Sequence, residues 1–366
     1  MENLHKLLAY FEEIIDVDHY NKAIETQKKV LRFEEAESLC VRISYPQPEF
    51  KRYSIKEIHQ DMAKMMYNEL LASLCTFEIK DYSMAMIRAN YGVGTLPSAF
   101  GAESIIAGDN MPWVKHLSKE EIKAIIAKGV PDADTGFGKR IVETYEFYKE
   151  TLSKYPKCNE VIRLFHPDFQ GPLDLAHMLW GSDIYMDMYD EPELVHELLK
   201  LVTETYIDRM KRIKPYLNDE IDGFNFHWSH LYPGSIVLRN DSAVNLSKDM
   251  YKEFAMKYDD MIYDAFGKAS MHFCGRADQW VFDMANSENI LALNFGHAPN
   301  ATFGMEYLDF LKPEMFDKRK SVVSYTVWQS EMKEMDFDKY RTGISYNLSA
   351  SDRKEAEELL ARCKLK

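Results

Sequence analysis

Residues 270–280, SMHFCGRADQW, place a histidine and a cysteine two positions apart at the end of an apolar run. Side chains at positions i and i+2 of a strand point to the same face, so His272 and Cys274 share one face and Met271 and Phe273 the other. An imidazole and a thiolate on one face supply two of the four ligands of a tetrahedral zinc, or form a thiolate–imidazolium pair. A buried cysteine beside a hydrogen-bonded histidine gives the same pattern, so the elements around it decide between these interpretations.

Short apolar or β-branched runs recur along the chain and alternate with helical segments. They cover residues 82–92, 160–171, 222–234, 268–275, 289–299, 321–329 and 342–350, with an eighth at 235–241 or at 38–46. Such alternation favours a parallel sheet, and no G-x-G-x-x-G follows a strand, as a dinucleotide-binding sheet would require. We therefore predict an α/β fold, a (β/α)8 TIM barrel over residues 80–366, preceded by an N-terminal helical extension over residues 1–79.

Helix starts are marked by capping signals. Capping boxes at Ser54 and Ser118, each with a glutamate three residues later, predict helices over residues 54–74 and 118–129. A proline near the start of residues 190–213 predicts a third helix there, since proline is favoured at the first helical position.

The active site of a (β/α)8 barrel lies at the C-terminal ends of the strands. Five of the eleven histidines fall at these strand ends or in the loops beyond them. We predict catalytic roles for Arg88, His166 and Asp241. The predicted substrate-binding residues are Tyr91, Gln170, His227, His230, Asn294 and Trp328.

Four blocks of the sequence resemble the uroporphyrinogen decarboxylase superfamily. They are GPLDLAHMLWGSDIYMDMYDEPELVHELLKLVTETYI, LSKDMYKEFAMKYDDMIYDAFG, SMHFCG and ILALNFG, and the resemblance covers roughly residues 80–365. It implies a (β/α)8 barrel. The superfamily contains haem-pathway decarboxylases and zinc-dependent methyltransferases that act on methylcobalamin and coenzyme M or related methyl carriers.

The chain looks closer to the methyltransferase branch. The decarboxylases carry an arginine-rich N-terminal motif of the form MRQAGRY, which this sequence does not contain. A substrate with eight carboxylates also needs a strongly basic cleft, whereas the formal net charge here is −14.

The methyltransferase branch is marked by His-x-Cys at the fifth strand and a further cysteine at the last strand. His272 and Cys274 match the first feature, but the last strand, GISYNLSA, has no cysteine, and Cys363 belongs to the terminal helix. The resemblance therefore implies a zinc ion held by His272 and Cys274 with a third ligand from elsewhere. We name His297 for this position, with His227, His230 and Asp241 as alternatives by location.

The resemblance implies a zinc-dependent methyltransferase that moves a methyl group between a corrinoid (cobalamin) protein and a small substrate or a thiol such as coenzyme M. Zinc stabilises a thiolate or acts as a Lewis acid on an ether oxygen. Methylcobalamin would be supplied by a corrinoid carrier protein that docks at an open barrel mouth.

Two other functions remain open at this level. One is a metal-free lyase or decarboxylase, with Arg88 or Arg239 holding a substrate carboxylate and His166 or His272 donating a proton. The other is a non-catalytic carrier or sensor that binds a corrinoid or tetrapyrrole.

The composition of the chain limits which partners and which cellular compartment can be expected. An acidic surface repels phosphate backbones, so we expect no nucleic-acid partner. The N-terminal helix carries acids rather than a basic stretch and an apolar core, and no long apolar window occurs, so we expect neither a secretion signal nor a membrane span. Five scattered cysteines fit reduced thiols, and we expect a cytoplasmic protein.

Overall fold

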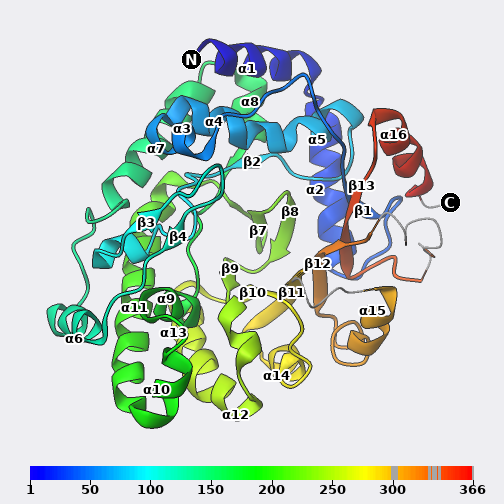
Figure 1. Ribbon diagram of the computed structural model, residues 1–366. Coiled ribbons are helices and arrows are strands. Elements are labelled where there is room, and N and C mark those ends of the chain that lie inside the picture. The colour runs from blue at the N-terminus through cyan, green and yellow to red at the C-terminus, as the bar shows by residue number, and fades with distance from the viewer. Residues whose placement is uncertain (298–303, 329–330, 332–335, 337–338, 365–366) are drawn as a thin grey trace.

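The computed structural model describes residues 1–297, 304–328, 331, 336 and 339–364 and shows a mixed α/β fold (Figure 1). The helices are α1 (Glu2–Ile14), α2 (Val17–Leu31), α3 (Ile55–Gln60), α4 (Met62–Leu70), α5 (Leu74–Ile79), α6 (Lys119–Lys128), α7 (Gly138–Leu152), α8 (Pro156–Val161), α9 (Pro172–Trp180), α10 (Ile184–Asp190), α11 (Pro192–Ile213), α12 (Lys248–Tyr251), α13 (Lys257–Phe266), α14 (Val281–Asn286), α15 (Met305–Leu311) and α16 (Arg353–Arg362). The strands are β1 (Cys40–Ser44), β2 (Met86–Ile87), β3 (Ser104–Ile105), β4 (Trp113–Val114), β5 (Arg163–Leu164), β6 (Glu220–Ile221), β7 (Phe224–His227), β8 (His230–Pro233), β9 (Val237–Arg239), β10 (Ala269–Cys274), β11 (Ile290–Gly296), β12 (Ser321–Thr326) and β13 (Ile344–Ser349).

Parallel strands form the centre of the molecule, as predicted. Over the described residues the largest sheet has six strands in the order β1-β13-β12-β11-β10-β9, and every pair in it is parallel. A second parallel sheet pairs β2 with β5. Backbone hydrogen bonds link the two sheets at both edges, from Tyr82 N–H to Val41 O (3.2 Å) and from Gly171 N–H to Arg239 O (2.8 Å). A Cβ at residue 171 would collide with the Arg239 carbonyl, so this close approach requires glycine.

Both runs considered for the eighth strand are strands. Residues 38–46 contain β1, which pairs with β13, and residues 235–241 contain β9, which pairs with β10. Residues 1–79 therefore supply an edge strand of the central sheet as well as helices. The expected ends of the 289–299 and 321–329 runs, residues 298–299 and 329, lie outside the described residues.

The expectation of a sheet strand at residues 222–234 is wrong. This run folds back on itself as the antiparallel hairpin β7–β8, with Trp228 and Ser229 as its two-residue turn. Hydrogen bonds tie the hairpin to surrounding elements, from Ser270 Oγ in β10 to Pro233 O (2.7 Å) and from Met84 N–H to Ser229 O (2.8 Å). In Figure 1 the hairpin lies in the middle of the view, with β2 above it and β9–β11 below.

Most helix predictions hold, with one break. Both capping boxes form, and α6 and α11 begin where the sequence indicated. The helix expected over residues 54–74 is divided at Asp61, whose backbone is extended and whose side chain accepts from the N–H groups of Ala63 and Lys64. Asp61 thus caps a new helix, because a short acidic side chain competes with the helical backbone for its own hydrogen bonds.

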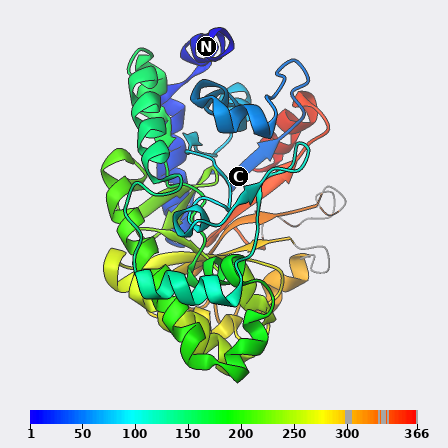
Figure 2. The same cartoon turned by 60° about the vertical axis from the view of Figure 1, so that its left-hand side comes forward.

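One buried apolar cluster extends through the described residues and packs the helices against the sheets. In α1, for example, Leu4, Leu7, Leu8 and Phe11 are buried, which is the spacing of one helical face. Figure 2 shows the N-terminal helices at one end of the molecule (blue) and the helices around residues 184–266 at the other (green and yellow). Among the described residues, no helix combines the length and apolar character needed to cross a bilayer.

Candidate metal centre

Three side chains that can bind a metal converge where β9 and β10 end. Asp241 follows β9 at the start of a 3-10 helix (Asp241–Asn245), and His272 and Cys274 belong to β10. Cys274 Sγ lies 3.5 Å from His272 Nε2, which lies 3.4 Å from Asp241 Oδ1. One ligand atom from each residue falls within 4.8 Å of the other two. The predicted sharing of one face by His272 and Cys274 is confirmed.

The opposite face of β10 is apolar, as the alternation requires. Phe273 is fully buried and its ring meets those of Trp280 and Phe295 at centroid separations of 5.0 and 5.2 Å. Packing of Phe273 against these rings fixes the register of β10, and therefore directs His272 and Cys274 toward Asp241.

Asn294 in β11 fixes the orientation of the His272 ring. His272 Nδ1 lies 2.5 Å from Asn294 Oδ1, while Asn294 Nδ2 donates to the Val323 carbonyl (2.7 Å). The amide oxygen must therefore accept, so Nδ1 carries the proton and Nε2 presents its lone pair to Cys274 and Asp241. This is the outer hydrogen bond that metal-binding histidines usually have.

The spacing of the donor atoms fits zinc. With Zn–S of about 2.3 Å and Zn–N of about 2.0–2.1 Å, S and N ligands of a tetrahedral ion lie about 3.6 Å apart, and N and O ligands about 3.3 Å apart. The observed separations of 3.5 Å (Sγ to Nε2) and 3.4 Å (Nε2 to Oδ1) match both edges. A carboxylate, an imidazole and a thiolate with a fourth position open are a ligand set of the kind that catalytic zinc uses.

Gly296 makes room for the cysteine sulfur. It pairs with Cys274 across β10 and β11, and a Cβ at residue 296 would collide with Cys274 Sγ and lie 3.0 Å from His272 Cε1. Its φ is not in the left-handed region. Glycine is therefore required here for space and not for backbone conformation.

The buried carboxylate of Asp174 and the backbone N–H of Cys274 hold Asp241 in place. The backbone N–H groups of Asp241 and Ser242 donate to the two oxygens of Asp174 in α9 (2.8 and 2.6 Å), and Asp241 Oδ1 accepts from Cys274 N–H (2.7 Å). Burial and the nearby Asp241 raise the pKa of Asp174 to about 7. Sequence reasoning missed Asp174, whose only signal is an acidic residue within the apolar stretch GPLDLAHM.

Without a cation the thiol of Cys274 stays protonated at neutral pH. Burial and then the Asp241 carboxylate raise the pKa of Cys274 to about 12. Burial also lowers the pKa of His272, against the opposing effect of Asp241. A bound metal ion would favour the thiolate of Cys274 over the thiol, because metal binding displaces the proton from sulfur.

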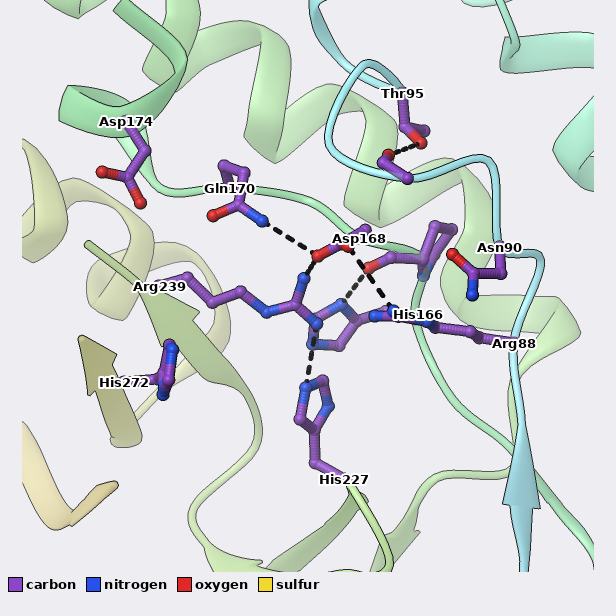
Figure 3. A network of polar contacts seen from close by, with 12 residues as sticks. Arg88, Asn90, Thr95, His166, Asp168, Gln170, Asp174, His227, Arg239 and His272 are labelled. Carbon is purple, nitrogen blue, oxygen red and sulfur yellow. Dashed lines mark hydrogen bonds and ion pairs between the residues drawn. The ribbon is translucent and has the colours of Figure 1, made fainter. Parts of the chain in front are cut away.

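A network of buried arginines, histidines and one carboxylate lies beside the metal centre (Figure 3). Arg239 forms an ion pair with Asp168 and its Nη2 lies 3.0 Å from His227 Nε2. Arg88 approaches the same carboxylate from the opposite side (3.5 Å), and Gln170 Nε2 donates to it (2.9 Å). Of the predicted residues, Arg88, Gln170 and His227 thus meet in one cluster.

His166 and His230 are buried and neutral in character. The ring of His166 lies tilted against that of His227, with the ring centroids 4.6 Å apart. Burial, followed by the charge of Arg239, lowers the pKa of His166 well below its usual value. His230 Nε2 contacts Asn347 Oδ1 (2.9 Å), and burial lowers the pKa of His230 to about 4. Within the described part of the chain, the candidate metal-binding group consists of Asp241, His272 and Cys274 and includes neither His166 nor His230.

The remaining predicted residues lie apart from the three metal-binding side chains. Tyr91 is buried with its hydroxyl 2.8 Å from Thr144 Oγ1 in α7. His297 is not part of the metal-binding group, and its ring lies 4.8 Å from that of Trp328, which is 45% exposed. Asp241, which the sequence analysis named as an alternative to His297, is the third member of the candidate metal-binding group.

The fold and the site together define a mixed α/β protein with a candidate metal centre at the C-terminal edge of its parallel strands. No protein-family model matches the sequence, and no curated protein is similar to it in sequence. Among solved structures, a methyltransferase from Methanosarcina mazei has a similar fold, with a TM-score of 0.63 over 93% of this chain and 97% of that one. The two sequences are 14% identical, so the similarity shows a common fold.

Proposed function

We propose that the two parallel sheets form one closed (β/α)8 barrel. The linking hydrogen bonds at both sheet edges support the strand order β1, β2, β5, β9, β10, β11, β12, β13 around the ring. The hairpin β7–β8 would then occupy part of the interior. The division into an N-terminal extension (1–79) and a barrel (80–366) remains a prediction, and it would have to assign β1 to the barrel.

We further propose that the protein is a zinc-dependent methyltransferase that works with a corrinoid carrier protein. The observation that carries this proposal is the convergence of Asp241, His272 and Cys274, in which His272 Nε2 lies from Sγ and from Oδ1 at the separations that a tetrahedral zinc requires. The fold shared with a methyltransferase is consistent with it. The substrate would be a small thiol or a small methylated compound that reaches the open fourth position.

When bound, zinc would supply a Lewis acid for a substrate thiol or ether oxygen. Asp241, His272 and Cys274 would hold it, and their two anionic groups would limit its net positive charge. Asn294 keeps the Nε2 lone pair of His272 directed at the site. Asp174 keeps Asp241 in place through two backbone N–H groups.

Metal analysis tests the proposal. We expect the purified wild-type protein to contain about one zinc per chain and the His272→Ala variant to contain much less. The zinc-loaded wild type should transfer the methyl group of methylcobalamin to a small thiol, which loses its proton, leaving cob(I)alamin, and the change in cobalamin absorbance follows the reaction. Wild-type protein without stoichiometric metal would contradict the proposal, and release of CO2 from an organic acid by metal-free protein would favour the lyase.

A further inference from the structure

A small cavity lies beside the metal centre, on the side of the arginine network. It has a volume of about 210 Å³. Arg42 from β1 and Arg88 after β2 contribute cations to its wall, and Phe165 and Trp228 contribute aromatic rings. Glu69 and Met86 also line it. The cavity thus combines a basic wall with flat apolar walls.

The charged groups in and beside this cavity do not balance. Two guanidinium groups line the cavity, those of Arg42 and Arg88, and one carboxylate does, that of Glu69. Outside its wall, Asp168 pairs with both Arg88 and Arg239. The buried histidines beside them are neutral, since burial lowers the pKa of both His166 and His227. The cavity wall itself therefore carries more positive than negative charge, which favours an anionic ligand.

The two arginines of the cavity wall keep donors available. Nη1 of Arg88 is buried and has no hydrogen-bond partner among the described residues. The backbone of Arg42 pairs with β13, and its charge acts on Asp81, but among the described residues its guanidinium forms no side-chain hydrogen bond or close ion pair. The oxygens of Glu69 accept from amides instead, from Arg88 N–H (3.3 Å) and Asn90 Nδ2 (2.8 Å). Guanidinium donors of this kind are suited to an oxyanion with two or more adjacent oxygens, such as a carboxylate or a sulfonate.

Trp228 is shared between the cavity and the metal centre. Its ring lines the cavity, lies 4.7 Å from the ring of His272, and has the Arg239 guanidinium 4.7 Å from its centroid. Trp228 (φ 42°) and Ser229 (φ 64°) form a two-residue hairpin turn with both φ angles positive, where Asn-Gly would normally stand. A bulky residue kept at a strained turn position indicates a role for its side chain.

We propose that this cavity binds the anionic end of the substrate, a single carboxylate or sulfonate on a small flat organic molecule, between Arg42 and Arg88. Because the Trp228 ring adjoins both the cavity and His272, a substrate held at its anionic end would extend along this ring toward the metal centre. The description of the ligand as a substrate rests on the proposed function, whereas binding of the anion does not.

Calorimetric titration of the full-length protein with benzoate, methanesulfonate and the uncharged benzyl alcohol tests this inference. We expect at least one of the two anions to bind, and benzyl alcohol to bind at least about tenfold more weakly, because charge-assisted hydrogen bonds contribute about 1.5–3 kcal/mol. Benzoate alone would identify a carboxylate site, and methanesulfonate alone a sulfonate site.

Two variants and a matched control localise the site. Arg42→Gln and Arg88→Gln should each weaken anion binding at least about tenfold. Arg212→Gln removes the same charge from the exposed end of α11 and should change affinity less than about twofold. Because the Arg42 guanidinium has no side-chain hydrogen bond or close ion pair among the described residues to lose, Arg42→Gln should keep the wild-type melting temperature and zinc content, which a purely structural arginine would not.

The binding result is separable from the zinc result. His272→Ala should lose zinc and still bind the anion, so a failure of the methyltransferase proposal leaves this measurement intact. The inference is overturned if neither anion binds the wild type, if benzyl alcohol binds as well as the anions, or if Arg42→Gln and Arg88→Gln bind like the wild type.

Discussion

Replacement of Gly296 by alanine tests the metal centre without removing any ligand. The new methyl group would occupy the space of Cys274 Sγ and lie 3.3 Å from Cys274 Cβ and 3.0 Å from His272 Cε1. Because Gly296 and Cys274 are paired in neighbouring strands, the backbone cannot move apart without breaking the β10–β11 ladder. The thiol must therefore turn away from Asp241 and His272.

The expected loss of metal affinity follows from the loss of one ligand. Complete zinc sites with four ligands bind with about 10–16 kcal/mol, or about 3 kcal/mol for each ligand. At about 1.4 kcal/mol per tenfold change, Gly296→Ala should weaken zinc binding by about two orders of magnitude. The added methyl group should also cost the metal-free protein about 1–3 kcal/mol of stability through overpacking.

Chelator competition for zinc and urea denaturation measure these two effects separately. Cys274→Ala removes the sulfur and should lower zinc affinity as much as Gly296→Ala does. In the Cys274→Ala background the additional Gly296→Ala change should cost less than about 1 kcal/mol, because the colliding atom is gone. A Gly296→Ala variant with wild-type zinc affinity, or equal stability costs in both backgrounds, would refute the geometry on which the site is based.

Three further changes have defined outcomes. Asn294→Leu removes the acceptor that orients His272 and should lower zinc affinity about 10–100-fold in chelator competition, and unchanged affinity would rule out this orienting role. Ser229→Gly relieves a left-handed backbone at the hairpin turn and should raise the free energy of unfolding by about 0.5–1 kcal/mol in urea, where a clear loss would argue against strain. Burial raises the pKa of Asp219 to about 6 from an ordinary value of 3.8. Between these values the folded chain keeps a proton that the unfolded chain releases, so stability falls as pH rises, by up to about 3 kcal/mol. Asp174, whose pKa is about 7, contributes a slope of the same sign. Asp219→Asn should therefore reduce the fall in stability between about pH 4 and 7 by up to about 3 kcal/mol in urea denaturation, and an unchanged slope would exclude a contribution from Asp219.

The sequence predicted the parts of the fold that depend on local periodicity. The parallel strands, the capping boxes at Ser54 and Ser118, and the common face of His272 and Cys274 follow from residue spacing alone. The prediction failed at residues 222–234, where alternation marks a strand but does not say which strands it pairs with. It also missed the break at Asp61, because a helical apolar spacing continues across the cap.

The sequence by itself determined which groups could bind a metal at the end of β10, because a period of two residues directs His272 and Cys274 to one side. Only the tertiary structure decided the third candidate ligand and the groups that support it. Asp241, Asn294 and Gly296 come from the ends of neighbouring strands, and their distances from His272 depend on strand pairing and on the close packing of Phe273 behind it. Interactions between residues far apart in the chain set these distances, and no local pattern in the sequence encodes them.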